Sequence, residues 1–273
     1  TSSVDTAVAV AVMSSAIGTP AATDSTITVG GNTSSAMARG NVATTALTAS
    51  ATQISDPTAT GATVDASTGA VIASNIALSS QSQTDNITAN ADGAYGISLN
   101  DDTATAVAST NSSVSVSQNV LSSMGVANVA SNSVSVSGTT VDTTSAIANG
   151  QGANAAIAAD TDMTLSTVTT STGSTIDTSA NAARAVAVAN DATNSSSVSG
   201  TNVDITTAGA NASIDGVART SDATHSVVNA QSASVSVSAD VSLSAENQEV
   251  GFGSTLGVAT GTVAFDSNSA LAE

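Results

Sequence analysis

Apolar and polar side chains alternate with a period of two residues along much of this 273-residue chain. The pattern is plain at residues 113–117 and 133–137, both SVSVS, and in the valine-rich run 4–12. Successive side chains of a strand point to opposite faces, so this period predicts strands with one buried and one solvent-facing side. Asn, Asp and Gly, which favour tight turns, separate the runs. We therefore expect an all-β fold.

Bulky side chains are too scarce to fill an ordinary globular core. Aromatic residues are 1% of the chain and charged residues 9%, whereas Ala, Ser and Thr are abundant. Protein interiors are close-packed, so small side chains suit a narrow space between two sheets. This composition disfavours most enzymes and favours a slender architecture.

Sequence repeats indicate how the strands are arranged. Residues 136–150 and 198–212 match at 10 of 15 positions, 62 residues apart, and shorter echoes recur about 20 residues apart. Fixed-period similarity indicates a repeat architecture. We expect a β-solenoid with coils of about 20 residues, in which stacked Ser, Thr and Asn hydrogen-bond as ladders. An elongated β-sandwich of hairpins is the alternative.

Charge and composition limit the partners. The net charge is −18 and the only cations are Arg39, Arg184 and Arg219, so there is no basic cluster for nucleic acid or an anionic membrane surface. The longest apolar run, 7–13, is too short to cross a membrane as a helix. Without cysteine there are no disulfides or thiolate metal sites. An acidic, cation-poor chain of small residues is what we expect of an extracellular protein.

The two ends differ from the body, and we divide the chain into an N-terminal strand (1–17), a repetitive body (18–249) and a Gly-rich C-terminal strand or cap (250–273). The ends of a stack expose unpaired strand edges, which must be capped or paired. The terminal segments are therefore either caps or, in the sharper hypothesis, strands that pair with a neighbouring subunit. The subunit-interface candidates are Val4, Val8, Val10, Val12, Gly251, Gly253, Gly257 and Gly261.

No constellation of residues indicates catalysis. His225 is the only histidine and has Ser and Asp neighbours by composition alone. Residues 251–257 (GFGSTLG) do not fit a phosphate-binding loop, since no lysine or amphipathic helix follows. The chain is therefore expected not to be an enzyme and to need no cofactor, and the few features of a carbohydrate-active β-helix enzyme are missing.

Two weaker binding hypotheses stay open. Clustered carboxylates could hold a structural Ca²⁺ ion through hard oxygen ligands; the candidates are Asp160, Asp162, Asp101 and Asp102. Thr-x-Thr pairs, such as Thr26 and Thr28, are of the kind that stack on the flat faces of ice-binding solenoids, but they lack one fixed period.

The phrase AMARGNVATTALTASA from Ala36 resembles repetitive secreted bacterial surface and biofilm-matrix proteins, such as adhesins and holdfast-anchor-like proteins. SAIANGQGANAAIA from Ser145 is similar to β-roll repeats of trimeric autotransporter heads, although no coiled-coil stalk follows. The resemblance implies a structural, adhesive role outside the cell.

We therefore expect an extracellular fibre subunit that polymerises with itself, head to tail, into surface or biofilm-matrix filaments. Polysaccharide or other matrix components are further expected partners. The alternative is a monomeric adhesin or an ice-binding solenoid.

Overall fold

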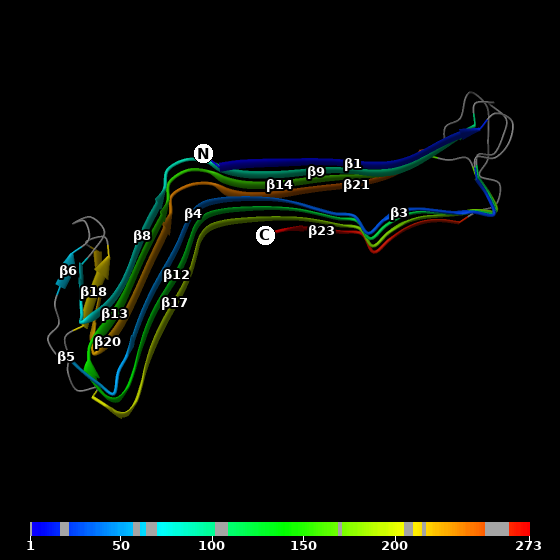
Figure 1. Cartoon of the computed structure of the whole chain (residues 1–273). Coiled ribbons are helices and arrows are strands. Elements are labelled where there is room, and N and C mark those ends of the chain that lie inside the picture. The colour runs from blue at the N-terminus through cyan, green and yellow to red at the C-terminus, as the bar shows by residue number, and fades with distance from the viewer. Residues whose placement is uncertain are drawn as a thin grey trace.

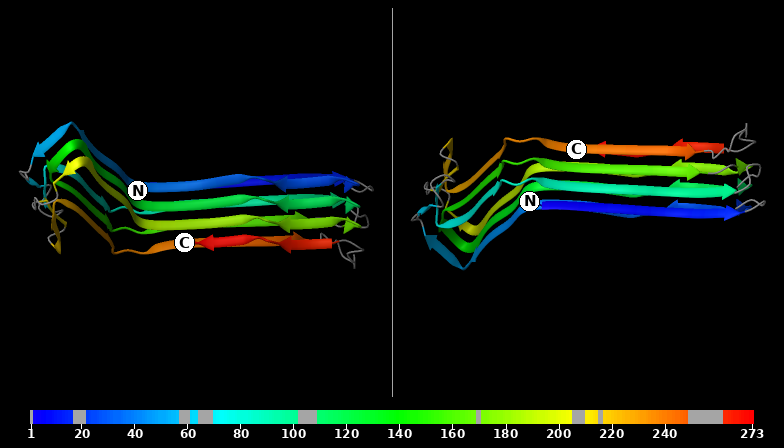
Figure 2. Two further views of the ribbon diagram at one scale, coloured as in Figure 1. Left: turned by 90° about the horizontal axis from the view of Figure 1, so that it is seen from below. Right: turned by 90° about the horizontal axis from the view of Figure 1, so that it is seen from above.

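The computed structural model describes residues 2–16, 22–56, 61–63, 70–101, 109–168, 171–204, 210–214, 217–248 and 262–273. Their regular structure is β-strand throughout, which confirms the all-β prediction. The chain winds in flat turns, and the turns lie one upon another in chain order (Figure 2). Each turn follows a long arm out and back and then a short arm set at an angle to it (Figure 1).

Four successive turns contain the 23 strands. Turn 1 comprises β1 (Ser2–Ala16), β2 (Ala22–Thr23), β3 (Thr26–Gly30), β4 (Thr33–Ser50), β5 (Gln53–Asp56), β6 (Gly61–Thr63), β7 (Ala70–Ile72) and β8 (Asn75–Gln83). Turn 2 comprises β9 (Ile87–Asp101), β10 (Ser109–Thr110), β11 (Ser113–Ser117), β12 (Val120–Thr143) and β13 (Ser145–Ala153). Turn 3 comprises β14 (Ile157–Val168), β15 (Ser171–Thr172), β16 (Thr175–Ser179), β17 (Ala182–Val203), β18 (Ala210–Ile214), β19 (Val217–Ala223) and β20 (His225–Ala233). Turn 4 comprises β21 (Val237–Gln248), β22 (Thr262–Asp266) and β23 (Ser269–Ala272).

Equivalent strands of successive turns pair in parallel and form three main sheets. The outgoing sheet has the order β1-β9-β14-β21, the return sheet β4-β12-β17-β23, and the closing sheet β8-β13-β20. A smaller sheet, β3-β11-β16-β22, precedes the return sheet. The outgoing and return sheets face each other in the long arm, and the second half of the return sheet faces the closing sheet in the short arm (Figure 1). Parallel pairing is what stacked turns require, and a sandwich of hairpins would be antiparallel.

Stacked residues are separated by far more than the expected 20 residues. The separation is 85, 70 and 80 residues between successive outgoing strands and 87, 62 and 87 between successive return strands. The repeat of 62 residues is one of these separations, since Val136 pairs with Val198. The echoes about 20 residues apart are not stacked: residues 113–117 lie in β11 and 133–137 in β12. The expected short coil is therefore replaced by a large flat turn.

Insertions at the tip of the short arm make the turns unequal. Turn 2 passes from β12 to β13 through one residue, Thr144, whereas turns 1 and 3 carry the strands β6 and β7, and β18 and β19. These strands form a separate sheet, β19-β18-β7-β6, whose pairs are antiparallel. Since β7 pairs with β18, insertions of turns 1 and 3 meet across turn 2.

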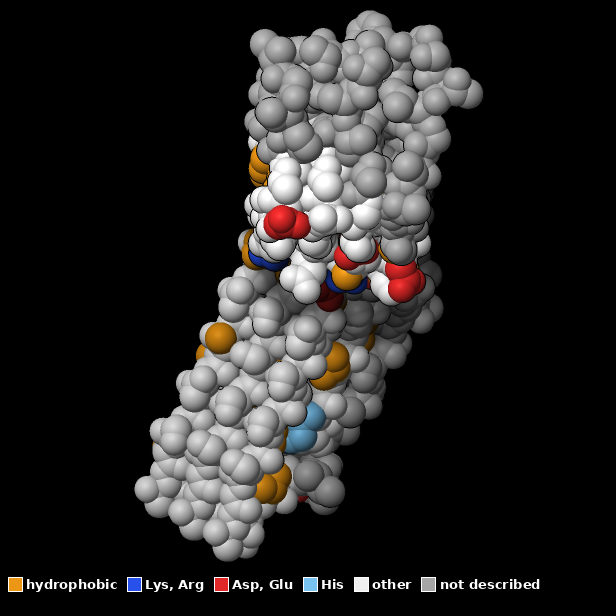
Figure 3. Space-filling model, turned by 90° about the vertical axis from the view of Figure 1, so that its right-hand side faces the viewer, with side chains coloured by type: hydrophobic (Ala, Val, Ile, Leu, Met, Phe, Trp, Pro, Cys, Tyr) orange, Lys and Arg blue, Asp and Glu red, His pale blue; other side chains and the backbone are white. Residues whose placement is uncertain are grey.

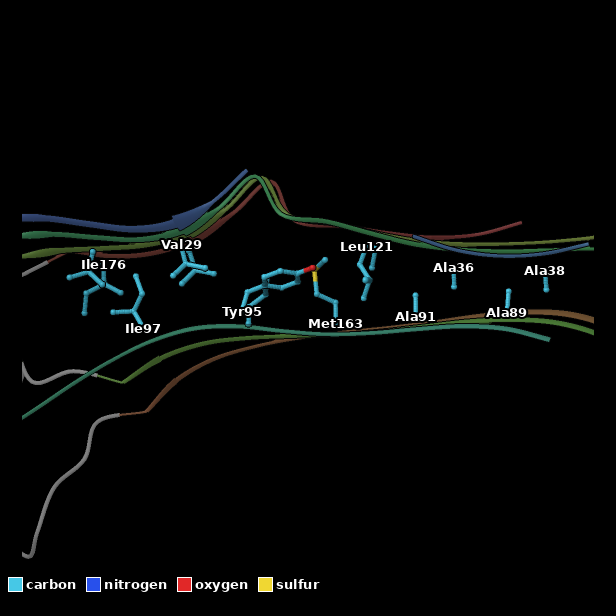
Figure 4. Packing of buried hydrophobic residues seen from close by; sticks show 14 of the residues in the cluster. Val29, Ala36, Ala38, Ala89, Ala91, Tyr95, Ile97, Leu121, Met163 and Ile176 are labelled. Atoms are coloured by element: carbon cyan, nitrogen blue, oxygen red, sulfur yellow. The ribbon is translucent and has the colours of Figure 1, made fainter. Parts of the chain in front are cut away.

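The core of the long arm narrows along its length. Near the bend the inward side chains are small, and Ala36, Ala38, Ala89 and Ala91 are almost completely buried. Further out, the larger Tyr95, Ile97, Leu121 and Met163 fill a wider gap between the sheets (Figure 4). Gly93 makes room for this layer, because a Cβ atom there would lie 2.9 Å from the Tyr95 ring and 3.0 Å from Leu121. The bias towards small residues therefore follows from the spacing of the two sheets, as predicted.

Amide side chains hold the bend between the arms. Asn41, Asn128 and Asn190 form a ladder, with Nδ2–Oδ1 distances of 2.9 and 2.7 Å. Each also donates to a carbonyl of the closing strands, at Ser82, Gly152 and Ser232. A buried amide must be hydrogen-bonded, so these ladders fix both the stacking and the angle of the chain. The prediction of polar ladders is confirmed.

Tyr95 should be needed for its ring and not for its hydroxyl. The side chain is 1% exposed, and its hydroxyl has no hydrogen-bond partner among the described residues. We expect Tyr95→Ala to lower the free energy of unfolding by about 3–5 kcal/mol, as for other large buried rings. Tyr95→Phe should leave it unchanged or raise it, because it removes a buried unpaired group. Urea denaturation measures both, and a loss of more than about 1 kcal/mol in Tyr95→Phe would contradict this account.

Candidate functional site: the two end faces

The stack of turns has two ends, which we call the N-face and the C-face. The N-face is the free edge of turn 1, including β1, β3, β4 and β8. The C-face is the free edge of β21, β22 and β23 in the long arm and of β17 and β20 in the short arm. The unpaired backbone groups of such edges can pair with another strand.

The hydrophobic core is open at both faces. Within the stack, Ile97 and Ile157 are at most 1% exposed. Their stacking partners at the ends, Val12 on the N-face and Val237 on the C-face, are 36% and 41% exposed. Phe265 on the C-face is 47% exposed, whereas Thr178 beneath it is 1% exposed. Each face is thus a cross-section through the core, and apolar surface of this kind favours a covering partner.

The interface residues proposed from the sequence are only partly located. Val4, Val8 and Val10 point inward from β1 and pack, half-buried, against the core cluster. However, β1 pairs with β9 of its own chain along its whole length, so it is the first layer of the stack and not a projecting strand. Gly251, Gly253, Gly257 and Gly261 lie outside the described residues.

A second asparagine ladder runs through the long arm from one face to the other and was missed in the sequence. It consists of Asn32, Asn119, Asn181 and Asn268. Each residue follows a residue with positive φ at the corner before the return sheet: Gly31, Gln118, Ala180 and Ser267. Asn119 and Asn181 are completely buried. The sequence signal is the recurrence of an alternating strand and then x-Asn, as in SVSVSQN and TVAFDSN.

This ladder has a direction. Each Nδ2 donates to the Oδ1 of the next turn, at 2.8, 2.9 and 3.0 Å. The same Nδ2 donates to a carbonyl of the preceding turn: Asn119 to Val29, Asn181 to Val116 and Asn268 to Thr178. These backbone bonds fix which amide atom is nitrogen, since only nitrogen can donate to a carbonyl. At the N-face the ladder therefore ends on the Oδ1 of Asn32, and at the C-face on the Nδ2 of Asn268.

Carboxylates gather on the outer surface of the outgoing sheet. Asp5, Asn90, Asp160 and Asp240 stack in one column, and Asn90 Nδ2 donates to Asp5 Oδ1 at 2.8 Å. Burial, and then the charges of Asp240, Asp162 and Asp92, raise the pKa of Asp160. Of the proposed calcium ligands, Asp160 and Asp162 lie on β14, Asp101 ends β9, and Asp102 lies outside the described residues. No group of three or more His, Asp or Glu side chains able to hold a metal ion occurs in the described part of the chain.

His225 begins β20 and hydrogen-bonds a serine, but the pair is not arranged for nucleophilic catalysis. His225 Nδ1 lies 2.7 Å from Ser145 Oγ, and Ser145 is 1% exposed. Nε2 of His225 is buried and has no hydrogen-bond partner among the described residues, so no carboxylate orients the ring. Burial lowers the pKa of His225. The His side chain is visible in pale blue on the lower part of Figure 3, which also shows how scattered the apolar side chains are on that side of the molecule.

A shallow hollow of about 300 Å³ lies against the outgoing sheet. Its floor is made of small residues, including Ala7, Ala9 and Ala94, and Asp92 and Asp162 border it. It contains no histidine or basic group, and small apolar residues offer a ligand few specific contacts. The end faces are therefore the stronger candidate site.

Comparison with protein-family models, curated proteins and solved structures found no match for this chain. In the described residues there is no helix with the length and apolar character needed to cross a membrane.

Removing the Asp160 charge should stabilise the fold at neutral pH. A carboxyl with a raised pKa disfavours folding when ionised, and this penalty disappears as the pH falls through its folded-state pKa. We expect Asp160→Asn to raise the melting temperature at pH 7 and to leave it unchanged at pH 3. Asp191→Asn, on the outer surface of the return sheet, is the control for net charge. An equal increase in both variants, or none in Asp160→Asn, would contradict the local effect.

Proposed function

We propose that this protein is a non-enzymatic, extracellular structural subunit that polymerises through its end faces into surface or biofilm-matrix fibres. Its architecture in this proposal is a β-solenoid with large turns. The observation that carries it is that columns buried within the stack are exposed at both ends, as with Ile157 and Val237. Covering each face with another copy would bury the exposed apolar side chains and pair the free backbone edges.

The sides of the stack suit a soluble filament. Side chains pointing outward from the return sheet are mostly hydroxyls, and the net charge of −18 opposes side-to-side contact. Salt screens such repulsion within about 10 Å at 0.1 M ionic strength, so bundling would depend on salt. Growth along the stack and repulsion across it together favour fibres over amorphous aggregates.

A second candidate function is binding at the outer face of the short arm, as a monomeric adhesin or an ice-binding solenoid. Exposed hydroxyls stack there in rows, such as Thr44, Ser131 and Thr193. In the long arm, however, Thr28 stacks on Ser115 and then Asp177, so a Thr-x-Thr row is not maintained. Thermal hysteresis or polysaccharide binding by a monomer would favour this candidate.

A charge placed in the exposed cross-section of the core should stop polymerisation. Val8 points inward from β1, whereas its neighbour Ala9 points outward. We expect Val8→Lys to reduce the mass of filaments in electron micrographs at least about tenfold, because covering the N-face would then bury an unpaired ammonium group. Ala9→Lys adds the same charge to the same strand and should polymerise normally.

Circular dichroism of both variants checks that the monomer is still folded. Filaments of normal abundance from folded Val8→Lys would contradict assembly through the N-face, and a wild-type chain that stays monomeric at high concentration would refute the fibre function itself.

A further inference from the structure

We propose that copies join head to tail in one register, in which the asparagine ladder continues from Asn268 of one copy to Asn32 of the next. In this register β21, β22 and β23 of one copy pair with β1, β3 and β4 of the next. This inference rests on the proposed fibre function and specifies its partner, a second copy of this chain, and the contacts that join them.

The register follows from the columns of the stack. Ser2, Ile87, Ile157 and Val237 share one column of the outgoing sheet. A further turn on Val237 would therefore begin at the position of Ser2. Thr26, Ser113, Thr175 and Thr262 share a column of the smaller sheet, and Thr33, Val120, Ala182 and Ser269 one of the return sheet. The same placement thus continues three sheets at once.

The hydrogen bonds of the ladder are complementary at the two faces. Within the chain, each asparagine donates to the Oδ1 of the next turn and to a carbonyl of the preceding turn. In the joint, Asn268 Nδ2 would meet the Oδ1 of Asn32 in the next copy. Asn32 Nδ2 would meet the carbonyl of Phe265, which occupies the column of Val29, Val116 and Thr178. Both terminal residues then have the partners of the buried Asn119 and Asn181.

Apolar side chains also meet in this register. On the outgoing sheet, Leu243 and Ala245 would stack on Val8 and Val10 of the next copy, since these residues share columns within the chain. Leu243, Val8 and Val10 are partly buried residues packed against the core. On the smaller sheet, the exposed Phe265 would be covered by Val29. Every inward column of the long arm continues with an apolar or small residue or Thr6.

The direction of the ladders argues against joining two like faces. Two N-faces would bring the Oδ1 acceptor of one Asn32 towards another acceptor, and two C-faces would oppose the Nδ2 donors of two Asn268 residues. Strands that are parallel within the chain would also become antiparallel across such a joint. A joint between unlike faces leaves one of each free, so it generates an open filament and not a closed dimer. The long arm carries this joint, because it has four described layers and the short arm three.

Engineered cysteines test the register, since the natural chain has none. Ala9 and Ser244 share an outward column with two residues between them. Within one chain they are about 14 Å apart at about 4.8 Å per layer, but they are neighbours across the proposed joint. Cα atoms of a disulfide lie about 4.4–6.8 Å apart. Ala9→Cys with Ser244→Cys should therefore form disulfide-linked multimers when filaments are oxidised.

The matched control is Ala11→Cys with Ser244→Cys, which shifts one cysteine by two residues on the same surface. Its Cα atoms would be about 8 Å apart in the joint, beyond the reach of a disulfide, so we expect at least about tenfold less cross-linking. Filaments that cross-link equally well, or only, in the control would overturn the register. Dimers from Ala9→Cys alone would overturn the polarity. In each case filaments would still exist, so the fibre function would stand; absence of filaments from every variant would refute that function and this joint together.

Discussion

Stacking of each inward side chain on its counterpart in the next turn is the constraint on which this fold depends. A turn has no hydrophobic interior of its own, because each of its strands is paired only with strands of other turns. Amide ladders supply the most demanding part of this constraint. Asn119, Asn128 and Asn181 are completely buried, and each is hydrogen-bonded to neighbours in the turns before and after it. Low dielectric makes such networks strong when complete and costly when broken.

The same constraint explains why the ends of the stack are its reactive part. Inside, a column offers each residue a partner on both sides, whereas at the ends one partner is missing. Many stacked-strand proteins protect such edges with charges, prolines or covering segments. Here β1 presents valines to the open core, and the ladder reaches the C-face at Asn268. These faces are complementary in hydrogen bonding, which is why self-assembly is the function that best suits the geometry.

The strands and the kind of packing were predictable from the sequence, but the size of the turn was not. Alternation of the SVSVS type predicts strands because it is local. The match between residues 136–150 and 198–212 contained the true separation of 62, but dividing it into thirds was wrong. The match also continues past Thr143, where pairing changes: Ser145 stacks on His225, 80 residues away. Unequal insertions at the tip of the short arm hide the common period.

The candidate site was only half visible in the sequence. Valines at 4, 8 and 10 stand out because one strand carries them, so the N-face could be proposed. The C-face joins β21, β22 and β23, whose relation to β1, β3 and β4 is apparent only after the columns are known. The asparagines at 32, 119, 181 and 268 could have been found by aligning TITVGGN, SVSVSQN, TIDTSAN and TVAFDSN, but their spacings of 87, 62 and 87 escape a search for one fixed period.

The helical rise of the filament tests this account most directly. Four layers at about 4.8 Å each predict an advance of about 19 Å per copy, with strands perpendicular to the fibre axis. Cryo-electron microscopy of the purified, polymerised protein measures both quantities. A rise near that value and a layer spacing near 4.8 Å would agree with copies continuing one another's columns. Strands parallel to the axis, or a rise unrelated to four layers, would contradict it.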